Sequence, residues 1–414
     1  MDEAVYGFNS STFKNSMFKS SRVQTTSNHF KPFQTTSNNL KQPQTISNNL
    51  KQLQTISNNF KPPQTTSNNF KQSYITNIPY FCIRKLSSDM DFRTKIDIPK
   101  YAFGISHKDR CLFIGSCFAE NIGNNLIETK IHTSVNPTGI LYNPISIRES
   151  ILNALTAKKY TADDVFLSGG TWNCFDFHSR FSNVDKTICI ESINSASQML
   201  KYEIETANIM FVTFGTAFIY ELAENGRIVC NCHKQPEKRF NRKLLKVSEI
   251  VESWSECIEK IEAANPKLRI VFTVSPIRHW RDGAHQNQIS KSTLHLAIGE
   301  LNAKFGNTFY FPAYEIMMDE LRDYRFYAAD MVHPSDVAVQ YIWERFGETF
   351  FSEHTKSAIA RIGKITAAAN HRPLNPQSDE YKKFCSRMLD EIEKLKAEFG
   401  EIDFRDEEKS FLVP

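Results

Sequence analysis

No apolar run in the 414-residue sequence reaches the roughly 18 residues that a membrane-spanning helix requires. The opening residues, MDEAVYGFNSSTFKNS, lack the apolar core of a secretory signal, and a start at Met90 does not create one. The nine cysteines are odd in number and scattered, so they do not indicate a disulfide framework. These absences predict a cytoplasmic protein with reduced thiols and no membrane partner.

The sequence also lacks the usual marks of a metal site and of a nucleic-acid-binding surface. The segment Cys230-Asn231-Cys232-His233 has no second pair of ligands in register, so we interpret it as a strand end in preference to a zinc site. Residues 1–89 contain ten Lys and Arg against three Asp and Glu, whereas the other 325 residues contain 40 against 43. Because the main body is not basic, we expect no nucleic acid as a partner.

A ten-residue repeat accounts for residues 24–73, in five copies of which the first is QTTSNHFKPF. Each copy has one or two apolar side chains, whose burial cannot offset the entropy of ordering the segment. We therefore interpret residues 1–89 as a disordered low-complexity segment and residues 90–414 as one domain. The uniform copies also resemble a translated tandem nucleotide repeat, which gives the further hypothesis that the native chain starts at Met90; its intact mass would test this.

In the main body, short apolar runs alternate with helical patterns. The runs are nearly continuous, as expected for strands covered on both faces, and lie at 111–115, 131–135, 208–215, 269–275 and 308–314. Helical patterns cover 118–129, 144–155, 195–205, 247–263, 292–305 and 335–351. This alternation predicts a three-layer α/β/α sandwich around a mostly parallel sheet.

Three further segments complete the predicted fold. Residues 166–190 and 217–233 have hairpin-like patterns, the second with the tight-turn signal Asn225-Gly226. Residues 379–399 form an amphipathic pattern that predicts a helix for packing or association.

Ser116 follows the first predicted strand and precedes a helix, at the sheet edge where open α/β folds bind ligands. The N–H groups of that helix start can stabilise an oxyanion, although an ordinary helix-capping serine fits the same position. Asp330 lies three residues before His333, and its carboxylate can hold the imidazole Nδ1–H so that Nε2 takes a proton from a serine. A surface aspartate beside a histidine at a helix start is the alternative. Together the three residues supply a nucleophile, an orienting acid and a base.

These motifs resemble a known family. The segment Ile114-Gly115-Ser116-Cys117-Phe118-Ala119 contains the motif that names the GSCFA family, which is related to the SGNH (GDSL-like) serine hydrolases. Further similar stretches are NPTGILYNPISI (136–147), VTFGTAF (212–218), VSPIRHWRDG (274–283) and DMVHPS (330–335). The resemblance covers about residues 90–350 and implies an SGNH-hydrolase-like, flavodoxin-like fold with ester hydrolysis or acyl transfer by a catalytic serine.

The resemblance assigns roles residue by residue. It makes Ser116 the nucleophile, His333 the base and Asp330 the acid that orients it. It also makes Gly139 the oxyanion-hole glycine of the second conserved block. The third block departs from the pattern, because Ala217 stands where the related hydrolases have an oxyanion asparagine. Candidates for the missing donor are Asn136, Thr216, His178 and the Gly139 N–H.

Other polar residues are candidates for substrate binding. Arg278 and His279 follow the fourth predicted strand and could anchor a carboxylate or sugar hydroxyls, or simply form a solvated strand end. His178 lies in the aromatic-rich stretch 172–181, where it either lines the pocket or is a structural histidine.

We therefore predict a serine esterase that works through an acyl-enzyme, on a small ester such as an O-acylated carbohydrate. No metal or cofactor is implied, and no pattern indicates an oligomeric state. The same residues would serve an O-acyltransferase. Ala217 motivates a third hypothesis, a catalytically weakened binding or scaffold module.

Overall fold

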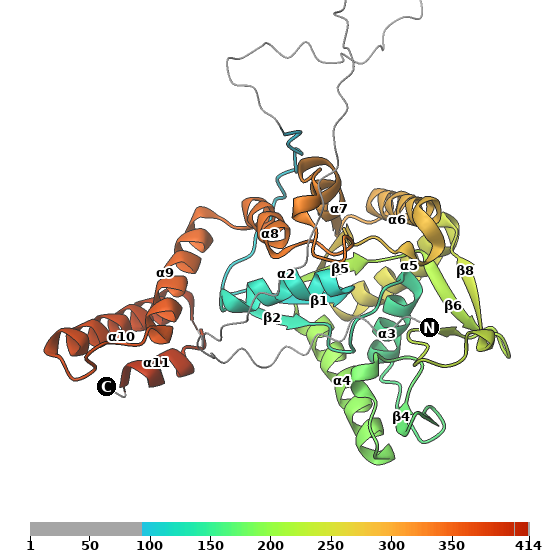
Figure 1. Cartoon of the computed structure of the whole chain (residues 1–414), viewed down its shortest axis with the longest axis horizontal. Coiled ribbons are helices and arrows are strands. Elements are labelled where there is room, and N and C mark those ends of the chain that lie inside the picture. Colours follow the sequence, from blue (N-terminus) through green and yellow to red (C-terminus); the bar gives the residue numbers. More distant parts are fainter. Residues whose placement is uncertain (1–92, 401, 413–414) are drawn as a thin grey trace, which may run out of the picture. The chain divides into compact units, whose positions relative to one another are not determined.

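The computed structural model describes residues 93–400 and 402–412, so the predictions for residues 1–89 lie outside the described residues. A five-stranded sheet forms the centre, with all neighbours parallel and the order β10-β9-β5-β1-β2 (Figure 1). Its strands are β1 (Arg110–Gly115), β2 (His132–Val135), β5 (Ile209–Phe214), β9 (Arg269–Val274) and β10 (Thr308–Tyr310). All five strand predictions are confirmed. The order is doubly wound, and its switch point lies between β1 and β5.

Helices cover both faces of the sheet because successive strand residues point to opposite sides. Leu112 and Ile114 of β1 pack into one apolar cluster, whereas Cys111 and Phe113 pack into another. The first cluster includes side chains of α3 (Pro144–Leu155), α4 (Lys186–Thr206), α5 (Val247–Ala264) and α6 (Gly283–Lys304). The second includes α2 (Cys117–Glu128), α7 (Ala313–Glu315), the π-helical turn Ile316–Glu320 and α8 (Asp336–Phe350). The predicted three-layer α/β/α sandwich is confirmed.

The hairpin prediction for residues 166–190 is only half right. A hairpin of β3 (Phe166–Ser168) and β4 (Thr171–Asn173) is present, but residues 186–190 belong to α4. The reason is Asp185, whose carboxylate accepts the N–H groups of Thr187 and Ile188 at 2.7 and 3.0 Å and starts the helix. This cap outweighs the β-branched character of the following residues.

The hairpin predicted within residues 217–233 is confirmed and extended. β6 (Phe218–Leu222) pairs with β7 (Ile228–Val229) and also with β8 (Phe240–Leu244), giving a small antiparallel sheet. Gly226 takes a φ of 72° in the predicted turn, a conformation that glycine adopts without strain. Single 3-10 turns occur at Ser179–Phe181, Glu237–Arg239, Trp280–Asp282 and Tyr324–Phe326.

Three helices after the sheet domain, α9 (Glu353–Asn370), α10 (Asp379–Phe399) and α11 (Arg405–Leu412), share an apolar cluster of their own. The predicted helix 379–399 is confirmed as a packing helix. Polar bonds tie this group to the sheet domain: Thr355 Oγ1 donates to the Ile105 carbonyl at 2.9 Å, and Lys130 Nζ lies 2.9 Å from a Glu407 carboxylate oxygen.

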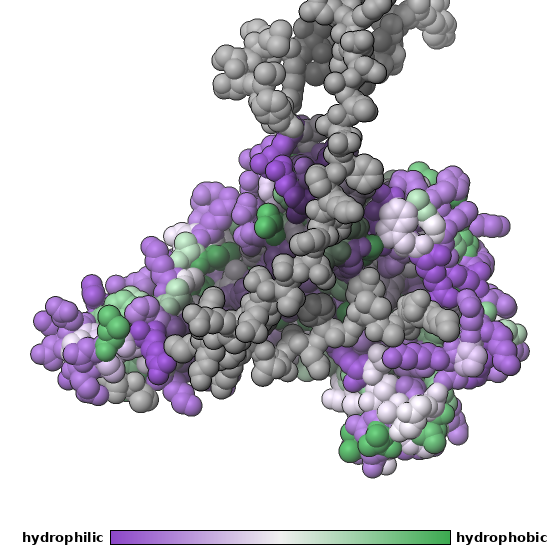
Figure 2. All heavy atoms as spheres, viewed as in Figure 1, coloured by the Kyte–Doolittle hydropathy of each residue, from purple (hydrophilic) through white to green (hydrophobic). Residues whose placement is uncertain are grey.

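Apolar side chains gather on one part of the face that Figure 2 draws. Figure 2 shows hydrophobic residues over the β3–β4 hairpin and the start of α4, where Leu167, Val184 and Ile188 are exposed. Across the described ranges, every helix is too short or too polar to cross a bilayer.

Candidate active site

Ser116 lies at the switch point of the sheet, directly after β1. Its N–H approaches the Thr213 carbonyl of β5 at 3.3 Å, and its side chain is buried. Although it occupies the N-cap position of α2, its hydroxyl makes no capping bond, and it has no hydrogen-bond partner among the described residues. The helix-capping alternative is therefore not what the structure shows. A buried hydroxyl without a partner suggests a group that is satisfied only with a ligand bound.

Gly115, the residue before Ser116, explains why β1 and β5 approach each other closely at this point. Gly115 has a φ of 135°, and a Cβ atom there would lie 2.2 Å from the Thr213 carbonyl oxygen. No larger residue fits without moving β5. Gly115 thus brings the start of α2 against the end of β5.

Asn136, in the loop after β2, packs against this turn. Its Oδ1 accepts the Gly115 N–H at 2.8 Å, and its own N–H donates to the Phe113 carbonyl at 2.8 Å. The residue is fully buried with a φ of 45°, and its amide Nδ2 has no partner among the described residues. A second buried polar group therefore lacks a partner beside the candidate nucleophile.

Gly139, in the loop after β2, packs against His178 in the segment after β4. A Cβ on Gly139 would lie 2.2 Å from the His178 Cβ, so only glycine fits. The Gly139 N–H donates to the Asn136 carbonyl at 2.8 Å, a bond that occupies the donor an oxyanion role would need. The His178 Nδ1 accepts the Arg180 N–H at 3.2 Å. Burial and the nearby Arg180 lower the His178 pKa, which favours a neutral ring.

Thr216 is engaged in local structure. Its hydroxyl lies 3.1 Å from the Ser290 hydroxyl of α6 and accepts the Phe218 N–H at 3.1 Å. The Ala217 N–H donates to the same Ser290 oxygen at 2.8 Å. These bonds fix the turn between β5 and β6, and the Thr216 hydroxyl is committed to it.

Asp330 and His333 form the predicted hydrogen bond in the loop before α8. The Asp330 Oδ2 lies 2.6 Å from the His333 Nδ1, and Oδ1 accepts the N–H groups of Val332 and His333 at 2.9 Å each. Partial burial raises the pKa of the Asp330 carboxyl, but the hydrogen bonds and the His333 ring outweigh it and lower that pKa. Asp330 is therefore a carboxylate at neutral pH.

Arg278 and His279 follow β9 and face the same edge of the sheet. The His279 N–H donates to Asn287 Oδ1 at 2.9 Å, while its Nε2 is buried without a partner among the described residues. A Cβ on Gly215 would lie 3.5 Å from that Nε2, so His279 sits at the end of β5. Burial, together with the smaller effects of the charges of Lys291, Arg242 and His333, lowers the His279 pKa to about 3. The Arg278 Nε is also buried without a described partner.

Lys291 lies in a Ser-Lys pair (290–291) that also resembles the family, but the sequence assigned it no role. It is 1% exposed, and its ammonium donates to the carbonyls of Gly215 at 2.6 Å and Ser275 at 2.7 Å, which follow β5 and β9. Burial lowers its pKa to about 7. The available signal was helical phase: Asn287, Ser290 and Lys291 continue the buried face formed by Leu294, Ile298 and Leu301.

The structure thus brings most predicted site residues to one edge of the sheet. Ser116, Asn136 and Thr216 follow β1, β2 and β5, and His279 after β9 lies close enough to His333 for their charges to interact. The Ser116 hydroxyl and the His333 ring share no hydrogen bond in the structure. Catalytic hydrogen bonds are often long without substrate and shorten when it binds.

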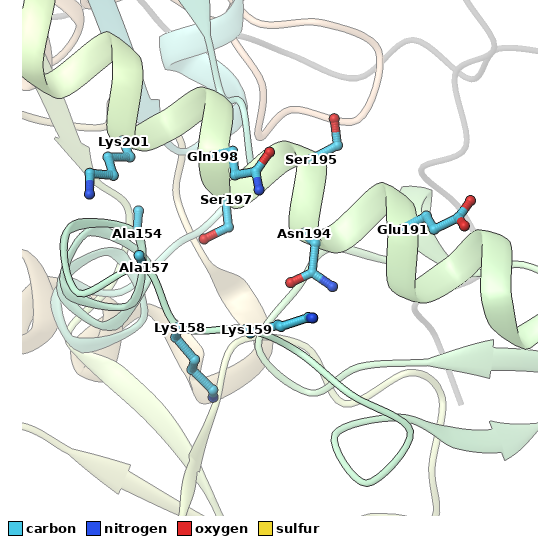
Figure 3. Close-up of a pocket in the computed structure, with 10 residues that line it drawn as sticks. All are labelled: Ala154, Ala157, Lys158, Lys159, Glu191, Asn194, Ser195, Ser197, Gln198 and Lys201. Carbon is cyan, nitrogen blue, oxygen red and sulfur yellow. The ribbon is translucent and has the colours of Figure 1, made fainter.

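A separate pocket of about 470 Å³ lies between the end of α3 and the middle of α4 (Figure 3). Lys158 and Lys159 follow α3 there, and the Lys159 side chain extends toward Asn194 of α4. None of the predicted site residues lines it. The pocket lies at the C-terminal end of α3, near the amino ends of the strands, whereas Asn143 marks the N-terminal end of α3. The pocket is therefore separate from the candidate active site.

Comparison with known proteins identifies the family of the chain. The model of the GSCFA family matches residues 110–346, and a model described as GSCFA domain protein, C-terminal domain, matches residues 362–412. A comparison with curated proteins finds no match.

Several solved structures are similar to part of the chain. An acetyl xylan esterase from the rumen bacterium Butyrivibrio proteoclasticus has a TM-score of 0.33 at 10% identity, covering 61% of this chain and 64% of its own. A family 3 carbohydrate esterase from Clostridium thermocellum has a TM-score of 0.29 at 9% identity, covering 58% and 94%. One from Talaromyces cellulolyticus has 0.28 at 8%, covering 62% and 99%. At these scores the likenesses carry no argument about function. The family models match more than half of the chain, and the protein therefore belongs to the GSCFA family.

Proposed function

We propose that this protein is a serine hydrolase of ester bonds with Ser116 as nucleophile, His333 as base and Asp330 as the acid that orients the base. The observation that carries the proposal is the buried Ser116 hydroxyl, which has no described partner and lies at a helix N-terminus at the switch point of the sheet. The short Asp330–His333 hydrogen bond supports it, because that bond fixes the tautomer with Nε2 as proton acceptor.

In the proposed reaction, the His333 Nε2 takes the Ser116 proton as Oγ bonds to the acyl carbon. The alcohol leaves with that proton, and an acyl-enzyme remains. His333 then takes a proton from water, whose oxygen attacks the acyl carbon and releases the acid and Ser116. A small O-acylated compound, such as an acylated sugar, as substrate and the cytoplasm as location belong to the same proposal.

A fluorophosphonate probe tests the nucleophile without a known substrate. We expect the wild-type protein to be labelled with one-to-one stoichiometry and Ser116→Ala to be unlabelled. Ser275→Ala is the matched control, because Ser275 is also buried at this sheet edge but follows β9, and it should label like the wild type. Absence of labelling in the wild type would favour the binding-module hypothesis. Product analysis with an added alcohol would separate hydrolysis from acyl transfer.

A further inference from the structure

Attack on an ester carbonyl places negative charge on the carbonyl oxygen, and that oxygen needs fixed hydrogen-bond donors. The third conserved block supplies none from its side chain, because Ala217 stands at that position. Its backbone N–H is already bonded to the Ser290 hydroxyl. Beside the N–H groups at the start of α2, a side-chain donor would therefore have to come from another part of the sheet edge.

Two of the candidate oxyanion donors already make hydrogen bonds within the protein. The Gly139 N–H is bonded to the Asn136 carbonyl, and the Thr216 hydroxyl is bonded to Ser290 and to the Phe218 N–H. His178, in the segment after β4, lies against Gly139 and not against Gly115 or Ser116 in any described contact. Of these four candidates, Asn136 is the one with a described hydrogen bond to Gly115, the residue before the nucleophile.

We propose that the Asn136 side-chain amide is the oxyanion donor that replaces the missing asparagine, an inference that rests on the proposed function. The Gly115 N–H donates to Oδ1 at 2.8 Å, which fixes the rotation of the amide and identifies the other end as the NH₂ group. That NH₂ group is buried and has no partner among the described residues. It is a buried donor on a side chain that is bonded to Gly115, the residue before Ser116.

The surrounding backbone holds this amide in place before any substrate binds. The Asn136 N–H donates to the Phe113 carbonyl, and its carbonyl accepts the Gly139 N–H, both at 2.8 Å. These bonds keep Asn136 at a φ of 45°, which asparagine tolerates better than most residues. A donor fixed in this way stabilises the transition state without reorganisation.

In the step that uses it, Ser116 Oγ forms a bond to the acyl carbon and its proton moves to His333 Nε2. The π electrons of the carbonyl move onto oxygen, which accepts a hydrogen bond from Asn136 Nδ2. When the tetrahedral intermediate collapses, those electrons re-form the carbonyl and the alcohol leaves with the proton from His333.

Asn136→Asp is the sharpest test. Aspartate keeps the shape, the tolerance of positive φ and the acceptor for the Gly115 N–H, but it removes the donor. We expect kcat/KM for p-nitrophenyl acetate to fall on the order of 10²–10³-fold, mainly through kcat, and fluorophosphonate labelling to slow in parallel. Asn136→Gly, which also allows positive φ, should show the same loss if aspartate disturbs folding.

Asn143→Asp is the matched control. Asn143 is a buried asparagine in the same loop, but its Oδ1 caps α3 and its Nδ2 is bonded to the Ser146 hydroxyl. It should keep wild-type rates. Wild-type rates in both Asn136 variants, with normal labelling of the unmodified protein, would overturn the role of Asn136 and leave the proposed function standing. No labelling and no hydrolysis by the unmodified protein would overturn both.

Discussion

At the scale of single residues, Asp330 lies 2.6 Å from the His333 Nδ1 and accepts two backbone N–H groups, and the proposed mechanism makes it the residue that fixes the His333 tautomer. Asp330→Asn can keep the backbone bonds, but its NH₂ group would face Nδ1 and favour the tautomer with the proton on Nε2. We expect kcat to fall on the order of 10³–10⁴-fold with little change in KM.

Asp323, in the turn before Asp330, provides the control for the Asp330→Asn experiment. Asp323 caps Tyr324–Phe326 by accepting the Arg325 N–H at 2.9 Å and has no histidine partner. Asp323→Asn should leave ester hydrolysis unchanged. An Asp330→Asn protein with wild-type kcat would show that Asp330 only shapes the loop.

His279 makes stability depend on pH. Burial lowers its folded-state pKa to about 3, whereas an unfolded chain has a histidine pKa near 6.5. Below about pH 6.5 the unfolded state binds a proton at this histidine that the folded state does not bind. The free energy of unfolding therefore decreases as the pH is lowered from about 6.5 to about 3. The slope from this group approaches ~1.4 kcal/mol per pH unit.

Urea unfolding at pH 7.5, 6.0 and 5.0 checks this prediction. His279→Gln should lose less stability than the wild type between pH 7.5 and 5.0, although burial also lowers the pKa of other histidines, such as His107 and His233. Equal losses in the two proteins would contradict a buried, neutral His279.

At the scale of elements, α6 joins the ends of two strands through one lysine. Lys291→Met would leave the carbonyls of Gly215 and Ser275 buried without their donor. We expect the free energy of unfolding to fall by about 1–3 kcal/mol. Lys304→Met, at the exposed end of the same helix, should change stability little. Denaturant unfolding of both variants gives the comparison, and a similar loss in both would contradict the role of Lys291.

The sheet was predictable because its strands are buried on both faces and are therefore almost continuously apolar. The helices were predictable only where their buried face is apolar. α6 starts at Gly283, not Ser292, because polar Asn287, Ser290 and Lys291 form the buried face of its first turns. α9 went unpredicted because alanines form much of its packing surface, and α11 because it is short and charged.

The residues of the candidate site also differ in how far the sequence could predict them. Ser116 and the Asp330–His333 pair are local in sequence, so the motifs placed them. The bond between Gly115 and the Asn136 side chain, and the bonds of Lys291, join residues far apart in the chain. No local pattern encodes such contacts, since they arise only when the strand order is known.

At the scale of the whole molecule, the C-terminal helices and the sheet domain depend on each other. Buried Ala358, Ile362 and Ile365 of α9 pack against α10 and α11. Removal of residues 371–414 would expose this face to water. We expect such a protein to have a lower melting temperature and to bind a hydrophobic dye, and normal melting without dye binding would contradict this.

Removal of residues 1–89 should have the opposite outcome. The decapeptide copies offer one or two apolar side chains each, too few to form a core. The described members of the two clusters that flank the sheet lie between Ile96 and Ile359. We expect residues 90–414 to melt within about a degree of the full chain and to react with fluorophosphonate at the same rate. Calorimetry and labelling of the two proteins side by side measure both quantities. A large drop in melting temperature would show that the repeat segment contributes to the folded domain, and would contradict the division of the chain at Met90.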